Sequence, residues 1–158
     1  MIKFILAGLL ASTAIVNTAN ADFSEIGKFG TPANNPSAEE TSAEIIAATA
    51  DGMKLVYSDS PANALGMIDI TDPTNPKPLG SMDLGGEPTS VAIKNGQAYV
   101  GINTSKNYVE PSGHLLVVDL ASGKEVTKIE LGGQPDSVAV SPDGTFVAVA
   151  IENERNED

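Results

Sequence analysis

The 158-residue sequence predicts an all-β fold of about two and a half four-stranded antiparallel β-propeller blades, an incomplete propeller. Three observations support this prediction. A repeat of 46–47 residues runs through the chain, each repeat divides into four short runs rich in Val, Ile, Leu and Tyr, and Asn-Gly or Asp-Gly pairs separate some of these runs. Such pairs between apolar runs are strong hairpin signals.

The N-terminus has the pattern of a secretory signal peptide. Lys3 precedes an apolar run at 4–16, and Ala19-Asn20-Ala21 forms an A-x-A cleavage site. The run is shorter than the ~20 residues of a membrane span, which favours a cleaved signal over an anchor helix. We therefore expect residues 1–21 to be removed, no membrane insertion afterwards, and a periplasmic or secreted location.

Residues 22–41 are expected to form an N-terminal arm or linker, because glycines and prolines interrupt a polar stretch there. The segment 41–44, Thr-Ser-Ala-Glu, resembles a capping box at the start of a helix. The repeat register instead places a strand at 44–50. We prefer the register, because tertiary context overrides local propensity.

The repeat is clearest between residues 84–93 and 131–140, which share seven of ten residues at an offset of 47. A fainter third copy is marked by Asp51-Gly52, which precedes an apolar run as Asp143-Gly144 does. In the second unit the expected strands and their connections follow in order: 89–94, Asn95-Gly96, 97–103, the loop 104–113, 114–120, Ser122-Gly123 and 125–131.

The partial propeller domain is expected to span 42–158, and propellers close with 4–8 blades. Repeat units bury their faces only against neighbours. We therefore expect the sequence to be the N-terminal fragment of a longer protein, with the remaining blades or a downstream domain as its partner. The alternative is a small β-sandwich complete in itself.

Composition restricts the partners further. The net charge is −12, which disfavours nucleic acid and anionic membranes and suits cations or cationic ligands. Cysteine is absent, so disulfides and soft-metal sites are excluded, and oxygen-ligated cations such as Ca²⁺ remain. The single histidine, His114, cannot supply both a triad and a metal site, and we expect it to be structural or exposed.

The loops that follow the second and fourth strands of each blade emerge on one face, and they are longer than the turns on the opposite face. Loops on a rigid scaffold often carry function, so ligand contacts are expected there. The candidate binding residues are Asp59, Asn103, Lys106, Tyr108, Glu110 and Arg155. The sequence contains no catalytic motif, and no catalytic residue is assigned.

Several segments carry a family resemblance: Val-Ala-Val-Ser-Pro-Asp-Gly at 138–144, and Gly-x-Pro-x-Ser-Val-Ala at 86–92 and 133–139. They resemble bacterial exported β-propellers of the YVTN type, and more narrowly the N-terminal part of proteins with an "esterase-like activity of phytase" domain. The resemblance implies that Glu152, Asn153 and Glu154 could bind Ca²⁺, as in calcium-dependent phytase propellers.

Two functions remain open. The first is a binding or scaffold module without catalytic activity of its own, for a small-molecule or protein ligand that the sequence does not identify. The second is the N-terminal part of a calcium-assisted phosphoesterase that sequence beyond residue 158 completes. Whether the protein is an enzyme stays undecided at this point.

Overall fold

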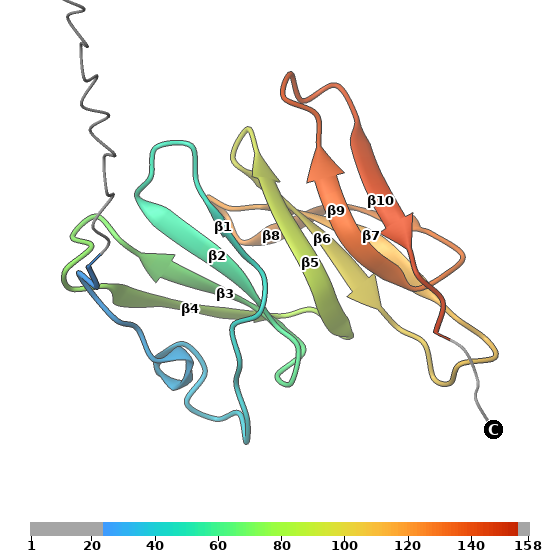
Figure 1. Cartoon of the computed structure of the whole chain (residues 1–158), viewed down its shortest axis with the longest axis horizontal. Coiled ribbons are helices and arrows are strands. Elements are labelled where there is room, and N and C mark those ends of the chain that lie inside the picture. Colours follow the sequence, from blue (N-terminus) through green and yellow to red (C-terminus); the bar gives the residue numbers. More distant parts are fainter. Residues whose placement is uncertain (1–23, 155–158) are drawn as a thin grey trace, which may run out of the picture.

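The computed structural model describes residues 24–154. Within this range, short segments separated by turns form ten antiparallel strands (Figure 1). Sheet 1 contains β1 (Ile46–Ala48), β2 (Lys54–Asp59), β3 (Ala64–Asp69) and β4 (Lys77–Asp83). Sheet 2 contains β5 (Glu87–Lys94), β6 (Gln97–Asn103), β7 (Gly113–Asp119) and β8 (Lys124–Glu130). Sheet 3 contains β9 (Pro135–Val140) and β10 (Val147–Ile151).

Two four-stranded sheets and one two-stranded sheet confirm the predicted all-β fold of about two and a half blades. The strand order within each sheet follows the sequence, as hairpin connections require. The capping-box alternative is wrong: β1 follows the 41–44 segment, and the only helix among residues 24–154 is the 3₁₀ turn η1 (Thr31–Ala33). The predicted signal peptide lies outside the described residues.

The β5–β6 hairpin has the turn that its Asn95-Gly96 pair predicts. Asn95 has φ of 51° and Gly96 has φ of 76°, so both turn residues lie in the left-handed region. A two-residue turn of this kind matches the twist of the flanking strands. In Figure 1 the β1–β2, β5–β6 and β9–β10 turns lie at the top of the view, and the loops after β2 and β6 lie at the bottom.

The sheets stack side by side: β5 packs across the face of sheet 1, and β9 packs across the face of sheet 2 (Figure 1). Apolar residues of sheets 1 and 2 form the core between them: Val56, Leu65, Leu84, Val91, Ala98, Val100, Ile102, Leu116, Val118 and Leu120. Sheets 2 and 3 are joined through β5, where Thr89 Oγ1 donates to Pro135 O (2.8 Å) and Val138 N donates to Ser90 Oγ (3.0 Å). The stacking follows from the repeat, because each blade buries its face against a neighbour.

The arm contacts sheet 1 through Asn34, which is 6% exposed. Its Nδ2 donates to Tyr57 Oη (3.1 Å) and to Met67 O (2.8 Å), and its Oδ1 accepts from Gly80 N (2.9 Å). Buried amides are stable when their donors and acceptors are paired. The segment before β1 is therefore part of the folded unit. None of the described residues forms a helix of the length and hydropathy that a membrane crossing requires.

The β9–β10 turn should make stability depend on pH. Asp143 Oδ1 accepts from Ser141 Oγ (2.7 Å), Thr145 N (3.1 Å) and Thr145 Oγ1 (2.8 Å), and these bonds lower the pKa of the carboxyl from 3.8 to about 2. A lowered pKa stabilises the fold above the unfolded value, and this contribution is lost as pH falls toward about 2.

The test is urea unfolding of wild type and Asp143→Asn between pH 5 and 2. The variant keeps an acceptor oxygen but cannot ionise, so its urea midpoint should fall less steeply with acid. Asp136→Asn, at an exposed β9 position, is the matched control and should keep the wild-type slope. Equal slopes for wild type and Asp143→Asn would contradict the role of this carboxylate.

Candidate functional site

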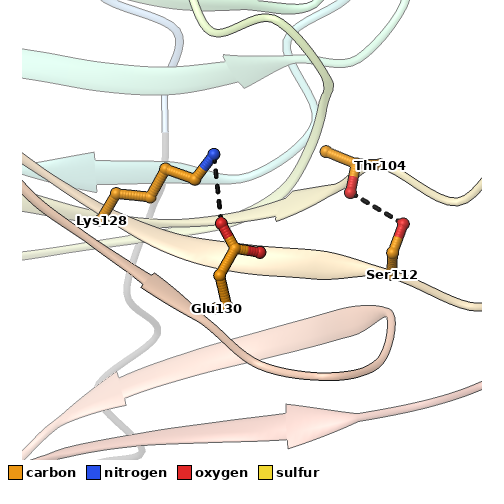
Figure 2. A network of polar contacts seen from close by, with 4 residues as sticks. All are labelled: Thr104, Ser112, Lys128 and Glu130. Carbon is orange, nitrogen blue, oxygen red and sulfur yellow. Dashed lines mark hydrogen bonds and ion pairs between the residues drawn. The ribbon is translucent and has the colours of Figure 1, made fainter.

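The loop between β6 and β7, residues 104–112, is closed at its base by threonine and serine. Thr104 N donates to Ser112 O (3.0 Å), and the two side-chain hydroxyls are hydrogen-bonded at 2.9 Å (Figure 2). Ser105 Oγ donates to Ser112 O (3.1 Å) and accepts from Ser112 N (2.9 Å). The base therefore extends the β6–β7 pairing with side-chain bonds and fixes the point from which the loop projects.

Asn107 shapes the tip of this loop. Its Oδ1 accepts from Val109 N and Glu110 N, both at 2.9 Å, which is the local turn that asparagine side chains favour. Tyr108 and Val109 are 58% and 70% exposed at the tip. Large exposed side chains on a braced loop are available for contact with a ligand or partner.

A shallow pocket of about 290 Å³ lies beside this loop, at the ends of sheets 2 and 3. Asn103 forms part of its wall: its Nδ2 donates to Glu87 Oε2 (3.1 Å), and its Oδ1 accepts from Ser105 N (2.9 Å). The pocket is lined by Glu87, Asn103, Ser105, Lys106, Asn107, Tyr108, Gln134 and Glu154. Its lining is polar, with hydrogen-bond donors and acceptors on several sides.

The segment after β10 closes the pocket from the sheet 3 side. Glu152 N donates to Gln134 O (3.0 Å), and Gln134 N donates to Asn153 Oδ1 (3.0 Å). These two bonds hold the segment against the β8–β9 connection and bring Glu154 to the pocket. Asn153 Oδ1, an expected ligand for Ca²⁺, therefore already accepts a hydrogen bond from the backbone of Gln134.

Four of the sequence-predicted site residues lie together in this pocket: Asn103, Lys106, Tyr108 and Glu154. Glu110 lies on the same loop without lining the pocket. Glu152 is exposed on the segment after β10, and Arg155 lies outside the described residues.

The predicted loop position of Asp59 is wrong. It is the last residue of β2 and pairs with Ala64, so a four-residue turn is enough to connect β2 and β3. The side chain is 1% exposed and accepts from Ser42 N (2.9 Å). Through this hydrogen bond, Asp59 holds the segment before β1 against sheet 1.

The candidate residues predicted from the sequence did not include four pocket residues: Glu87, Ser105, Asn107 and Gln134. A signal for two of them was present: Glu87 and Gln134 occupy the same position in the Gly-x-Pro segments of successive repeats. A repeat places equivalent residues at the same end of successive sheets. The polar residues at these two positions therefore indicated that Glu87 and Gln134 lie on the same face of the molecule.

His114 is 6% exposed on β7, directly opposite Glu130 of β8. Burial lowers the pKa of its imidazole, and Lys128 acts in the same direction. Lys128 forms an ion pair with Glu130 at 3.2 Å (Figure 2). His114 thus lies within the sheet, on the strand that follows the loop. Among residues 24–154, no group of three or more His, Asp or Glu side chains is arranged to hold a metal.

A larger groove of about 580 Å³ lies at the opposite end, between the tight turns of sheets 1 and 2. Its two carboxylates are engaged by their own turns: Asp51 Oδ1 accepts from Thr49 Oγ1, and Asp119 Oδ1 accepts from Ser122 Oγ, both at 2.6 Å. The rest of its lining is more than half apolar or glycine, with Thr49, Lys54, Lys94 and Asn95 as the other polar residues, whereas every residue that lines the smaller pocket has a polar side chain. The smaller pocket offers more side chains for specific contacts, so we take it as the candidate site.

The comparison with family models matches residues 44–158 to the choice-of-anchor I domain. The chain belongs to this family. The match begins just before β1 and includes all ten strands and the candidate pocket. Choice-of-anchor domains are typical of secreted or cell-surface proteins, and this agrees with the expectation that the chain is secreted. A comparison with curated proteins finds no match.

Solved structures of propeller type resemble this choice-of-anchor I domain in fold. A functionally unknown protein from Desulfotomaculum acetoxidans has 17% identity and a TM-score of 0.51, over 61% of this chain and 29% of that one. Kuenenia stuttgartiensis hydrazine synthase has 23% identity and a TM-score of 0.55, over 69% and 29%. A luciferin-regenerating enzyme has 19% identity and a TM-score of 0.57, over 73% and 39%. The chain therefore spans less than two fifths of each of these structures.

Proposed function

We propose that this choice-of-anchor I chain is a binding or scaffold module, without catalytic activity of its own, that recognises a ligand at the pocket between sheets 2 and 3. The observation that carries this proposal is the convergence of three chain segments on one polar pocket: the braced loop 104–112, the β8–β9 connection and the segment after β10. Rigid sheets that present polar loops are a common arrangement for recognition.

The lining favours a small polar ligand or a polar side chain of a protein partner. Glu87 and Glu154 supply carboxylates, Lys106 supplies an ammonium group, and Tyr108 supplies an aromatic ring with a hydroxyl. The acidic net charge of the chain raises the local concentration of cations. Among polar ligands, cationic ones therefore suit this end of the molecule best.

The setting of the module is part of the proposal. We place it in the periplasm or outside the cell, with the remaining blades of a propeller or a downstream domain as its partner and with no role in nucleic-acid binding. Sheets 1 and 2 have four strands and sheet 3 has two, so two further strands would make sheet 3 equivalent to them. The propeller-type neighbours are also much longer chains.

An NMR titration tests the binding site. The probes are calcium chloride, putrescine and inorganic phosphate, added separately to ¹⁵N-labelled protein. Putrescine should shift the amide signals of residues 103–108 and of Gln134, and phosphate should not. Tyr108→Ala and Glu87→Gln should each weaken this response at least fivefold, whereas Glu125→Gln, an exposed β8 control, should leave it unchanged. If no probe shifts these signals, the pocket is not the binding site for such ligands.

The second candidate is the N-terminal part of a calcium-assisted phosphoesterase of the YVTN or phytase-like type. The motifs at 133–144 support it, as does the position of Glu154 beside the pocket. Calcium would then bind through the Glu152 and Glu154 carboxylates, because Asn153 Oδ1 already accepts the Gln134 N–H. The calcium arm of the titration tests this directly: shifts confined to 152–154 would support it.

A further inference from the structure

The groove of about 580 Å³ lies at the end of the molecule opposite the candidate pocket, and both of its walls belong to four-stranded sheets. Three alanines, Ala48, Ala50 and Ala121, line it together with Ile93 and Leu120. Small-molecule sites have volumes of roughly 300–1,000 Å³ and mostly apolar linings. The groove has the size of such a site and an apolar part against which a ligand can pack.

A lysine closes the equivalent space between sheets 2 and 3. Lys94 is the last residue of β5, and its Nζ donates to Pro142 O in the β9–β10 turn. A Cβ on Gly144 of that turn would lie 3.4 Å from the Cγ and Cε atoms of this lysine. The strand β1 ends in Ala48, which is too short for such a contact, and a Cβ on Gly96 would meet no atom within 4 Å. The space between sheets 1 and 2 is therefore open because alanine takes the place of lysine.

Two carboxylates line the groove, one from each sheet. In both residues the local turn uses the Oδ1 atom: Asp51 Oδ1 accepts from Met53 N (3.0 Å), and Asp119 Oδ1 accepts from Ser122 N (2.8 Å). Among residues 24–154, neither carboxylate forms an ion pair. A carboxylate has two acceptor oxygens, so each of these residues can offer Oδ2 to a ligand.

The two lysines at the groove are already engaged with groups of the protein. The Lys94 ammonium is bonded to the β9–β10 turn. Turn hydrogen bonds, chiefly from threonine hydroxyls, lower the pKa of Asp51 and Asp69, and the charge of Lys54 acts in the same direction on both. The unmatched charge of the groove is therefore negative and is strongest at Asp119, in keeping with the net charge of −12.

We infer that this groove is a second binding site, for a small molecule with an apolar body and a primary ammonium group. The ammonium group donates to the Asp119 carboxylate, and the apolar body packs against Ile93, Leu120 and the alanines. Hydrogen bonds between ionised partners are the stronger kind, and the apolar contacts select against purely polar cations. The site does not rest on the proposed function, because the candidate pocket lies at the other end of the molecule and has a polar lining.

An NMR titration of ¹⁵N-labelled protein with 2-phenylethylamine tests the inference. This probe should shift the amide signals of residues 50–52, 93–96 and 119–121. Phenylacetate has the same ring with a negative charge and should leave these signals in place, and putrescine, which has no apolar body at one end, should shift them more weakly. Glu87→Gln, which changes only the candidate pocket, should not alter the response of the groove.

Asp119→Asn keeps the Oδ1 atom that accepts from Ser122 but loses the charge, so it should weaken the response about fivefold or more. Asp83→Asn is the matched control, because its Oδ1 accepts from Gly85 N (2.9 Å) in a similar turn away from the groove. It should respond like the wild type.

A second pair of variants tests the apolar part. Ala50→Leu places a larger side chain in the groove and should also weaken binding, whereas Ala43→Leu, at an exposed position before β1, should not. The inference is overturned if 2-phenylethylamine leaves the groove signals unchanged or if phenylacetate shifts them equally. It is also overturned if Asp83→Asn weakens the response as much as Asp119→Asn does.

Discussion

Gly66→Ala should be among the most destabilising single substitutions in this chain. Gly66 lies on β3 directly opposite Tyr57 of β2, and the hydroxyl end of the tyrosine ring lies against the glycine. A Cβ at this position would overlap the Cζ, Cε1 and Oη atoms of the ring. Tyr57 is 0% exposed and its hydroxyl accepts from Asn34 Nδ2, so the ring has no free space to enter. We expect a loss of about 3 kcal/mol, at the upper end for an overpacked core.

Thermal unfolding measures this loss as a decrease of roughly 10 °C in Tm. Gly30→Ala is the matched control, because the nearest atom to its added methyl would be Pro32 Cδ at 4.0 Å, and it should change stability by less than about 0.5 kcal/mol. The double variant Tyr57→Leu/Gly66→Ala removes the ring that causes the overlap. It should be more stable than the sum of the two single effects, by about 1 kcal/mol or more. Strict additivity would show that the ring and the glycine do not interact.

Asn34→Ala should release the N-terminal arm and lower stability by about 3 kcal/mol. The substitution leaves Met67 O and Gly80 N without their partner, and each unpaired buried group costs about 1–3 kcal/mol. Lys28 precedes Asn34 in the arm and is a trypsin site. Cleavage after Lys28 should therefore be at least tenfold faster in the variant than in wild type.

Asn35→Ala is the control for this experiment, because its Oδ1 accepts only from the exposed Ser37 hydroxyl among the described contacts. It should keep wild-type stability and wild-type cleavage after Lys28. If Asn34→Ala unfolds at the wild-type urea concentration, the arm is not a stabilising part of the fold. If it is destabilised but cleavage after Lys28 is unchanged, Asn34 acts within sheet 1 and not by holding the arm.

Most of the fold could be predicted from the sequence because its signals are local. Asn95-Gly96 specifies a turn that needs two residues with positive φ, and the structure has this turn at the expected place. The loop at 104–113 was predicted as the elaborated connection, and the structure begins β7 at Gly113. The repeat then transferred these signals to the weaker first unit, where it correctly favoured a strand over the capping-box helix.

The missed features depend on contacts between residues far apart in the sequence. Asn34 looks like any polar residue of an arm, and its burial depends on Met67 and Gly80 of sheet 1. Asp59 looked like a loop residue because the length of the β2–β3 pairing is not visible in the sequence. Gln134 enters the pocket through its backbone bonds to the segment after β10. No local pattern indicates these bonds, although the repeat position that Gln134 shares with Glu87 indicated the face on which it lies.

A turnover assay is the most direct test of the central claim, which is that the pocket between sheets 2 and 3 binds a ligand but has no catalytic activity. The substrates are p-nitrophenyl phosphate and p-nitrophenyl acetate, each with and without added Ca²⁺. General acid–base catalysis needs a titratable group held in place, but Glu152 and Glu154 are exposed and the one histidine, His114, is buried in β7. We predict turnover no faster than in a blank for every combination. Calcium-dependent turnover that disappears in Glu152→Gln or Glu154→Gln would contradict the binding-module account and favour the phosphoesterase.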